Sequence, residues 1–166
     1  MRKRKPRFRV ESRFLEERLI AIRKPNSSNA KVKAIRRPLA KTSGGKGLQL
    51  YARISGVTSE QASDRAKAYA ERLEREQPGH AVSRMTKSLR TGKVLIDWSQ
   101  NNGSKTTVAP YSLRARQFPT VSTPVTWAEV EACRQPQDLF FTAPDTATRV
   151  AEHGDLFAPL LGPPWD

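Results

Sequence analysis

The chain has 166 residues and a formal net charge of +14 at pH 7. This length suits one domain with a sizeable core, and the charge predicts a polyanionic partner, nucleic acid first and an acidic protein surface second. A single cysteine, Cys133, excludes a disulfide framework, and no apolar run approaches the ~18 residues that a membrane span needs, so we expect no membrane association.

The first 37 residues differ from the rest. Arg and Lys are dense there, and the apolar positions support only a weak helix at 12–23. No Asp occurs before Asp64. We interpret residues 1–37 as a basic segment, either a disordered phosphate-binding arm or sequence foreign to the fold, and residues 38–166 as the folded part.

A glycine-rich turn follows at 42–47 and leads into a predicted strand at 48–54. The turn combines Ser43, Lys46 and three glycines. Glycines let backbone N–H groups converge on an anion, and a lysine adds a point charge. The spacing is not that of a P-loop, because a strand follows and not a helix. A plain structural turn is the alternative.

Capping boxes predict the helices. Thr58 and Gln61 open a helix to residue 76, and a second box at 126–129 opens a helix to about residue 133. Pro144 in a first turn and a following glycine predict a helix at 142–153. With a short strand expected after the first helix, the pattern indicates an α+β fold, a mixed or antiparallel sheet with helices packed on it.

Residues 93–116 are expected to form a β-hairpin. An apolar run at 94–98 is followed by Asn102-Gly103, a strong hairpin turn signal, and by a second β-branched run at 106–109. Asp97 lies inside the first run. A carboxylate in that place costs free energy unless it is compensated, so Asp97 is either an edge-strand acid facing water or part of a site.

Three stretches, in this order, resemble the polymerase domain of bacterial DNA ligase D, in the archaeo-eukaryotic primase superfamily. Residues 41–51, KTSGGKGLQLY, resemble its second signature motif, and residues 85–101, MTKSLRTGKVLIDWSQN, resemble its third. Residues 109–116, APYSLRAR, resemble its downstream phosphate-contacting segment, and PVTWAEV at 124–130 resembles a usual helix start of the family. The sequence of the third motif looks most like actinobacterial versions of the family. The resemblance covers residues 38–165 and implies a partial primase catalytic core.

The resemblance also implies an activity. Such domains are nucleotidyltransferases of non-homologous end joining that bind DNA ends and nucleoside triphosphates, beside Ku and a DNA ligase, in the cytoplasm at the nucleoid. They use Mg²⁺ or Mn²⁺, which clamp the reacting oxygens while fixed donors neutralise the phosphates. By resemblance, Asp97 is the catalytic metal ligand, and Arg116 contacts template or packs. The implied nucleotide and phosphate ligands are Ser43, Lys46, Gln49, Gln100 and Arg114.

The chain departs from the family at two places. Gln49 stands where the family has a histidine; glutamine can donate a hydrogen bond to phosphate but cannot carry a charge. The family's Asp-x-Asp motif, with the other two metal ligands, should precede Ser43, but the first aspartate is Asp64.

One carboxylate cannot hold two hard cations. We therefore predict a C-terminal portion of the domain, with residues 1–37 arising from truncation or a shifted reading frame. It would bind nucleotide and DNA ends without being catalytically competent alone. The alternative is a non-catalytic, basic nucleic-acid-binding module derived from that domain.

Overall fold

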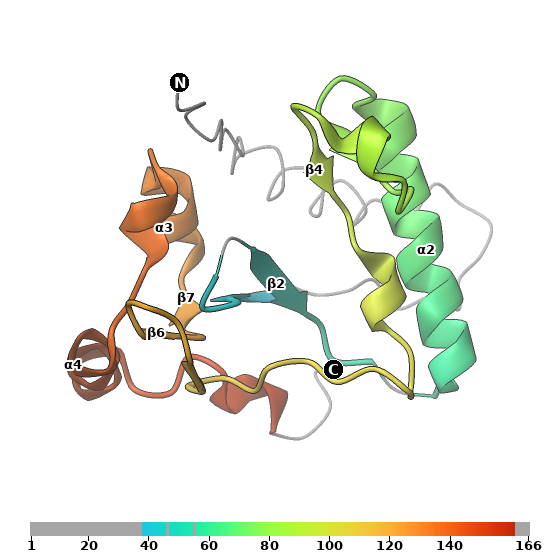
Figure 1. Cartoon of the computed structure of the whole chain (residues 1–166). Helices are drawn as coiled ribbons and strands as arrows, with labels where there is room; N and C mark the ends of the chain where they lie inside the picture. The colour runs from blue at the N-terminus through green and yellow to red at the C-terminus, as the bar shows by residue number, and fades with distance from the viewer. Residues whose placement is uncertain (1–37, 46, 55, 162–166) are drawn as a thin grey trace, which may run out of the picture. The chain divides into compact units, whose positions relative to one another are not determined.

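The structure, a computed structural model, describes residues 38–45, 47–54 and 56–161. The described residues form two compact units, one of residues 54–107 and one of residues 38–53 with 108–161 (Figure 1). The helix expected at 12–23 and the whole segment 1–37 lie outside the described residues. No helix in the described part has the length and hydrophobicity that crossing a bilayer requires.

The 54–107 unit is built on one long helix and a parallel strand pair. The predicted capping box is confirmed: the Thr58 hydroxyl accepts from the Gln61 N–H at 3.2 Å, and the Gln61 side chain accepts from the Thr58 N–H at 3.1 Å. The helix packs on the first of two parallel strands. The elements in chain order are α2 (Ser59–Glu76), β3 (Ala81–Val82), η1 (Lys87–Arg90), β4 (Val94–Leu95) and η2 (Trp98–Gln100).

The predicted hairpin at 93–116 is wrong. The N–H groups of Val94 and Ile96 donate to the carbonyls of His80 and Val82, at 2.7 and 2.9 Å, so β4 pairs in parallel with β3. Residues 106–109 form no strand. Neither residue of Asn102-Gly103 takes the positive φ that a tight hairpin turn requires.

The second unit is organised around β1, the central strand of a three-stranded antiparallel sheet in the order β2-β1-β7. A separate antiparallel ribbon joins β5 to β6. The α+β class is confirmed, with the helices expected near 126–133 and 142–153 both present. The elements are β1 (Leu39–Thr42), β2 (Leu48–Tyr51), β5 (Leu113–Arg114), β6 (Thr120–Val121), β7 (Pro124–Val125), α3 (Trp127–Ala132), η3 (Pro136–Leu139), α4 (Ala143–His153) and η4 (Ala158–Leu160).

The core of this unit lies between the sheet and α3. Ala40, Val125 and Val130 are buried together, from β1, β7 and α3. Trp127 packs against them, and its indole N–H donates to the Pro38 carbonyl at 2.9 Å. The strand that carries the glycine turn is therefore fixed by apolar packing at its start.

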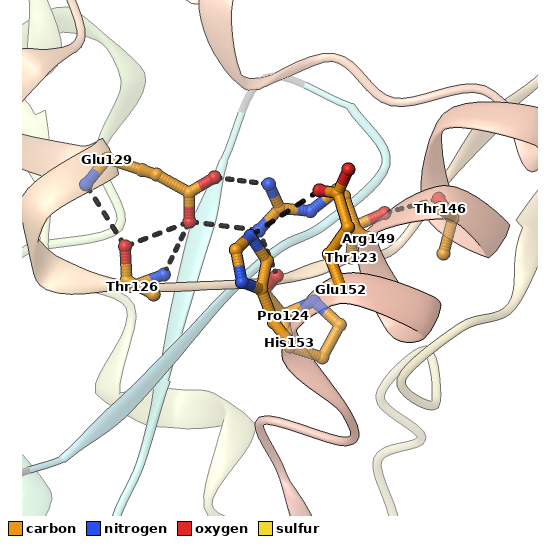
Figure 2. Close-up of polar contacts among 8 residues, drawn as sticks. All are labelled: Thr123, Pro124, Thr126, Glu129, Thr146, Arg149, Glu152 and His153. Atoms are coloured by element: carbon orange, nitrogen blue, oxygen red, sulfur yellow. Dashed lines mark hydrogen bonds and ion pairs between the residues drawn. The ribbon is translucent and has the colours of Figure 1, made fainter.

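An ion pair between Arg149 and Glu129 ties α4 to α3 (Figure 2). The two terminal guanidinium nitrogens, Nη1 and Nη2, both donate to the carboxylate, Nη2 at 2.9 Å. The guanidinium carbon lies 4.5 Å from the centre of the Phe141 ring. Partial burial would raise the Glu129 pKa, but hydrogen bonds from Arg149 and Thr126 outweigh it and hold the pKa below its ordinary value. The pair is therefore a specific clamp between the two helices.

We expect this ion pair to contribute more than an exposed one. In a double-mutant cycle with Glu129→Gln and Arg149→Met, the coupling energy should be ~1–3 kcal/mol, since both groups are largely shielded from water. The exposed pair Arg72–Glu76 is the control, with ~0.3–0.5 kcal/mol expected. Urea unfolding of the four variants of each cycle measures both values.

The same cycle has a defined pH dependence. Because the Glu129 pKa is depressed on folding, the stabilisation is present above its ordinary value of 4.5 and is lost as pH falls through the folded pKa. Equal couplings for the two pairs, or a coupling that persists after the carboxylate is protonated, would contradict the clamp.

Candidate functional site

The glycine turn between β1 and β2 is closed by its own residues. The Ser43 N–H donates to the Gly47 carbonyl at 2.8 Å, and the Gly47 N–H donates to the Ser43 hydroxyl oxygen at 3.2 Å. That hydroxyl still has its own hydrogen to donate, and no acceptor for it occurs in the described ranges. Lys46, predicted to bind phosphate, is outside the described residues.

Two arginines lie directly against this turn. A Cβ built on Gly44 would come within 2.5 Å of Arg114 Cγ, and one on Gly45 within 2.6 Å of Arg116 Nη2. The Thr120 hydroxyl donates to the Gly44 carbonyl at 2.6 Å and ties the turn to β6. Gly44 is therefore required by the close approach of Arg114 Cγ and of the backbone at 121–122, and also by its φ of 64°. At Gly45 the neighbouring atom is the end of a flexible side chain, which could move aside.

The arginines have no opposing charge in the described part of the chain. Neither the Arg114 nor the Arg116 guanidinium forms an ion pair or a side-chain hydrogen bond there. Guanidinium groups present several N–H donors in a fixed planar arrangement that matches phosphate or carboxylate oxygens. The turn and the arginines together form a donor-rich surface, and Arg116, which the sequence assigned to template contact or packing, belongs to it.

A buried lysine lies on the same unit, one residue from the end of β1. The Lys41 side chain has no exposed surface. Its ammonium donates to the Gln49 side-chain oxygen at 2.5 Å, to the Val108 carbonyl at 2.8 Å and to the Ser122 hydroxyl at 2.7 Å. Burial, and then the charge of Arg114, lower the Lys41 pKa from 10.5 to about 8.

Sequence reasoning missed the role of Lys41. In the sequence, Lys41 is noticed only as the first residue of the motif at 41–51. The sequence carries no clear signal for its burial, because alternation along the strand places Lys41 on the face opposite Ala40, which lies in the apolar core.

The predicted residues Asp97 and Gln100 come together in the other unit. Asp97 follows β4 and caps η2: its carboxylate accepts from the Ser99 N–H at 3.2 Å, the Ser99 hydroxyl at 2.7 Å and the Gln100 amide at 3.1 Å. Partial burial acts to raise the Asp97 pKa, but these hydrogen bonds and the charge of Lys105 hold it below its ordinary value. Asp97 is thus an oriented, ionised carboxylate, not a residue within a strand.

The described residues do not fit a two-cation centre. Nowhere in 38–45, 47–54 or 56–161 do three or more His, Cys, Asp or Glu side chains gather as a metal site would need. Asp97 is one carboxylate, and its oxygens already accept three hydrogen bonds. Magnesium and manganese in such sites need several oxygen ligands, which Asp97 alone does not supply.

We expect Gly44→Ala to be costly because the turn has no room for a methyl group. Gly92→Ala is the control, since Gly92 has a φ of 75° but nothing within 4 Å of its built Cβ. Both variants suffer the positive-φ strain, and only Gly44→Ala also displaces Arg114, an extra ~1–3 kcal/mol of overpacking. Urea unfolding measures the difference, and equal costs would contradict the close approach.

We expect the free energy of unfolding to depend on pH because the Lys41 ammonium is buried. Since folding lowers the Lys41 pKa from 10.5 to about 8, the unfolded chain binds more protons between these values, and the wild type gains stability as pH rises through them. At ~1.4 kcal/mol per pKa unit, the gain relative to Lys41→Met approaches ~3 kcal/mol. Urea unfolding in steps from neutral pH to pH ~10 measures it; parallel pH profiles for wild type and variant would show an unperturbed lysine.

Comparisons with known proteins identify the family of this chain. The family model described as "LigD, primase-polymerase domain" matches residues 33–157. The chain is 52% identical over 122 residues to the multifunctional non-homologous end joining protein LigD of Mycobacterium bovis, covering 72% of this chain and 15% of that protein. It is 48% identical over 120 residues to the LigD protein of Mycolicibacterium smegmatis, with the same two coverages.

A solved structure matches as well. The polymerase domain of Mycobacterium tuberculosis ligase D, solved in complex with DNA, has a TM-score of 0.72 and 44% sequence identity, covering 94% of this chain and 52% of that chain. The chain thus spans about half of the solved domain and 15% of the length of the curated relatives. On its sequence motifs, its α+β fold and these matches, the chain belongs to the LigD primase-polymerase family.

Proposed function

We propose that this chain binds the triphosphate of a nucleoside triphosphate at the glycine turn, as the phosphate-holding part of a nucleotidyltransferase. The observation that carries the proposal is the packing of Arg114 and Arg116 across Gly44 and Gly45 with no acidic partner in the described residues. Two uncompensated guanidinium groups beside a free hydroxyl donor favour a multiply charged, oxygen-rich ligand.

Each residue would act by charge or by hydrogen bonding. The arginines would neutralise phosphate oxygens, the Ser43 hydroxyl and the Gln49 amide would donate hydrogen bonds, and Lys46 would add a further charge. Lys41 would supply a positive charge that cannot leave its place, because its three hydrogen bonds fix it. These groups bind and orient phosphate; none of them performs proton transfer.

Asp97 and Gln100 would contribute to a complete active site only with further carboxylates. A bound Mg²⁺ or Mn²⁺ would then supply electrostatic activation of the reacting oxygens. In the chain as printed, no aspartate precedes Asp64, so we propose that the isolated chain does not catalyse nucleotide addition. The segment 1–37 has three glutamates and no Asp-x-Asp pair, so it lacks the motif that by resemblance carries the other two metal ligands.

DNA ends are the proposed macromolecular partner. The net charge of +14 favours association with a polyanion, and the solved relative is a complex with DNA. The relatives are named as end-joining proteins, which motivates Ku and a DNA ligase as further partners and the nucleoid as the place of action. The alternative, a non-catalytic nucleic-acid-binding module, shares the DNA interaction and differs in lacking nucleotide binding.

We expect inorganic triphosphate and ATP to bind the full chain in calorimetric titrations. Arg114→Ala and Arg116→Ala should each weaken binding ~10- to 100-fold, since hydrogen bonds to charged groups contribute ~1.5–3 kcal/mol. Arg134→Ala is the control, because it removes the same charge from an exposed position of the same unit. Equal losses in all three variants would indicate attraction by net charge alone and favour the nucleic-acid-binding alternative.

Primer extension tests the proposed lack of catalysis. With Mn²⁺, nucleoside triphosphates and a primed DNA end, we expect no incorporation by the isolated chain, because one carboxylate does not hold the metal ions. Incorporation that Asp97→Ala abolishes would overturn this proposal and show a complete active site.

A further inference from the structure

We propose that Lys41 is a positioning residue that fixes the Gln49 side-chain amide with its NH₂ group turned toward the phosphate ligand. The residue would act through Gln49 and not by touching the phosphate. This inference rests on the proposed triphosphate binding and identifies what makes Gln49 a donor in it.

The geometry of the pair determines the orientation of the amide. Lys41 and Gln49 are directly opposite in the antiparallel β1–β2 register, so their side chains share one face of the sheet. The ammonium lies 2.5 Å from the Gln49 side-chain oxygen. An ammonium has only donors, and a glutamine amide has an acceptor end and a donor end. The acceptor end must therefore face Lys41, which leaves the NH₂ group on the opposite side.

The ammonium itself cannot rotate out of this arrangement. The Val108 carbonyl and the Ser122 hydroxyl accept its other two hydrogens, and the Ser122 hydroxyl in turn donates to the Thr42 carbonyl at 2.7 Å. The Tyr51 ring lies 5.6 Å from the ammonium. Because the Lys41 ammonium has no exposed surface, water cannot replace these hydrogen-bond partners. The ammonium therefore stays in place and fixes the Gln49 side-chain oxygen that accepts from it.

The free end of the amide is available to a ligand. Gln49 is only half-buried, whereas Lys41 is fully enclosed. The unpaired Nε2 of Gln49 is not one of the buried unpaired nitrogens of the described residues, so it has surface open to solvent. Its NH₂ group has no acceptor in the described part of the chain. A freely rotating glutamine would offer either a donor or an acceptor, but one held by an ammonium offers only a donor.

This arrangement gives the surface its selectivity. With the amide fixed, Gln49 joins Ser43, Arg114 and Arg116 as a group that donates, and the set suits phosphate oxygens while rejecting cations. A histidine at the position of Gln49 would obey the same rule: it would accept from Lys41 at one ring nitrogen and carry its hydrogen on the other. The two residue types are then equivalent as donors.

The binding test uses inorganic triphosphate and the full chain. We expect Gln49→Met, which keeps the length and removes the amide, to weaken binding ~5–10-fold, and Gln49→Glu, which accepts from Lys41 but donates nothing, to weaken it at least as much. Gln49→His should retain affinity within ~3-fold at a pH where the imidazole is neutral. Unchanged affinity in Gln49→Met, with the wild type binding, would overturn the inference and leave the proposed function intact; no binding by the wild type would overturn both.

A double-mutant cycle separates positioning from a direct role. If Lys41 acts through Gln49, Lys41→Met should weaken binding strongly in the wild type and by less than ~2-fold in the Gln49→Met background. A loss of the same size in both backgrounds would show that Lys41 acts directly on the ligand. A loss of stability without a loss of affinity would show a structural role only.

A spectroscopic measurement keeps the inference testable if Lys41→Met does not fold. The side-chain NH₂ resonances of Gln49 in the wild type should shift on addition of triphosphate, and should also titrate with a midpoint near the Lys41 pKa of about 8. Tyr51, whose ring faces the ammonium, does not titrate there, because burial raises its pKa above its ordinary 10. Resonances that respond to neither triphosphate nor pH would overturn the inference.

Discussion

The unit that carries the glycine turn depends on one buried ammonium. Lys41 donates hydrogen bonds to three separate parts of the unit: Gln49 in β2, Val108, and Ser122 between β6 and β7. A buried charge without such partners costs several kcal/mol, so the acceptors must stay in place once the lysine is enclosed. No carboxylate among the described residues neutralises Lys41, which leaves its charge to act on the surroundings.

That excess of charge explains the chemistry of the neighbouring turn. Arg114 is close enough to contribute to the depressed Lys41 pKa, and its aliphatic part packs on Gly44. Placing like charges together in this way is unfavourable in the ligand-free protein and becomes favourable when a multiply charged anion binds. The turn therefore carries an electrostatic cost that a bound phosphate would relieve, and the absence of side chains at Gly44 and Gly45 permits the approach of the arginines.

Phosphate binding and catalysis place different demands on a chain. A phosphate surface requires only donors, and the glycine turn together with Arg114 and Arg116 would supply them here. A two-cation centre requires several carboxylates converging from separate strands, and the described residues offer Asp97 alone in an oriented, ionised form. A chain can therefore keep the first property while lacking the second, which is why nucleotide binding and nucleotide addition are proposed separately.

The sequence by itself determined what depends on neighbours along the chain. The capping boxes at Thr58 and at 126–129 predicted helix starts, because a cap and its partner are three residues apart. The ordered motifs predicted the family and the α+β fold. Tertiary structure decided the rest: β4 gave its hydrogen bonds to β3, which removed the expected hairpin and moved Asp97 to the cap of η2. It also enclosed Lys41, since acceptors 8, 67 and 81 residues away meet only in the folded chain.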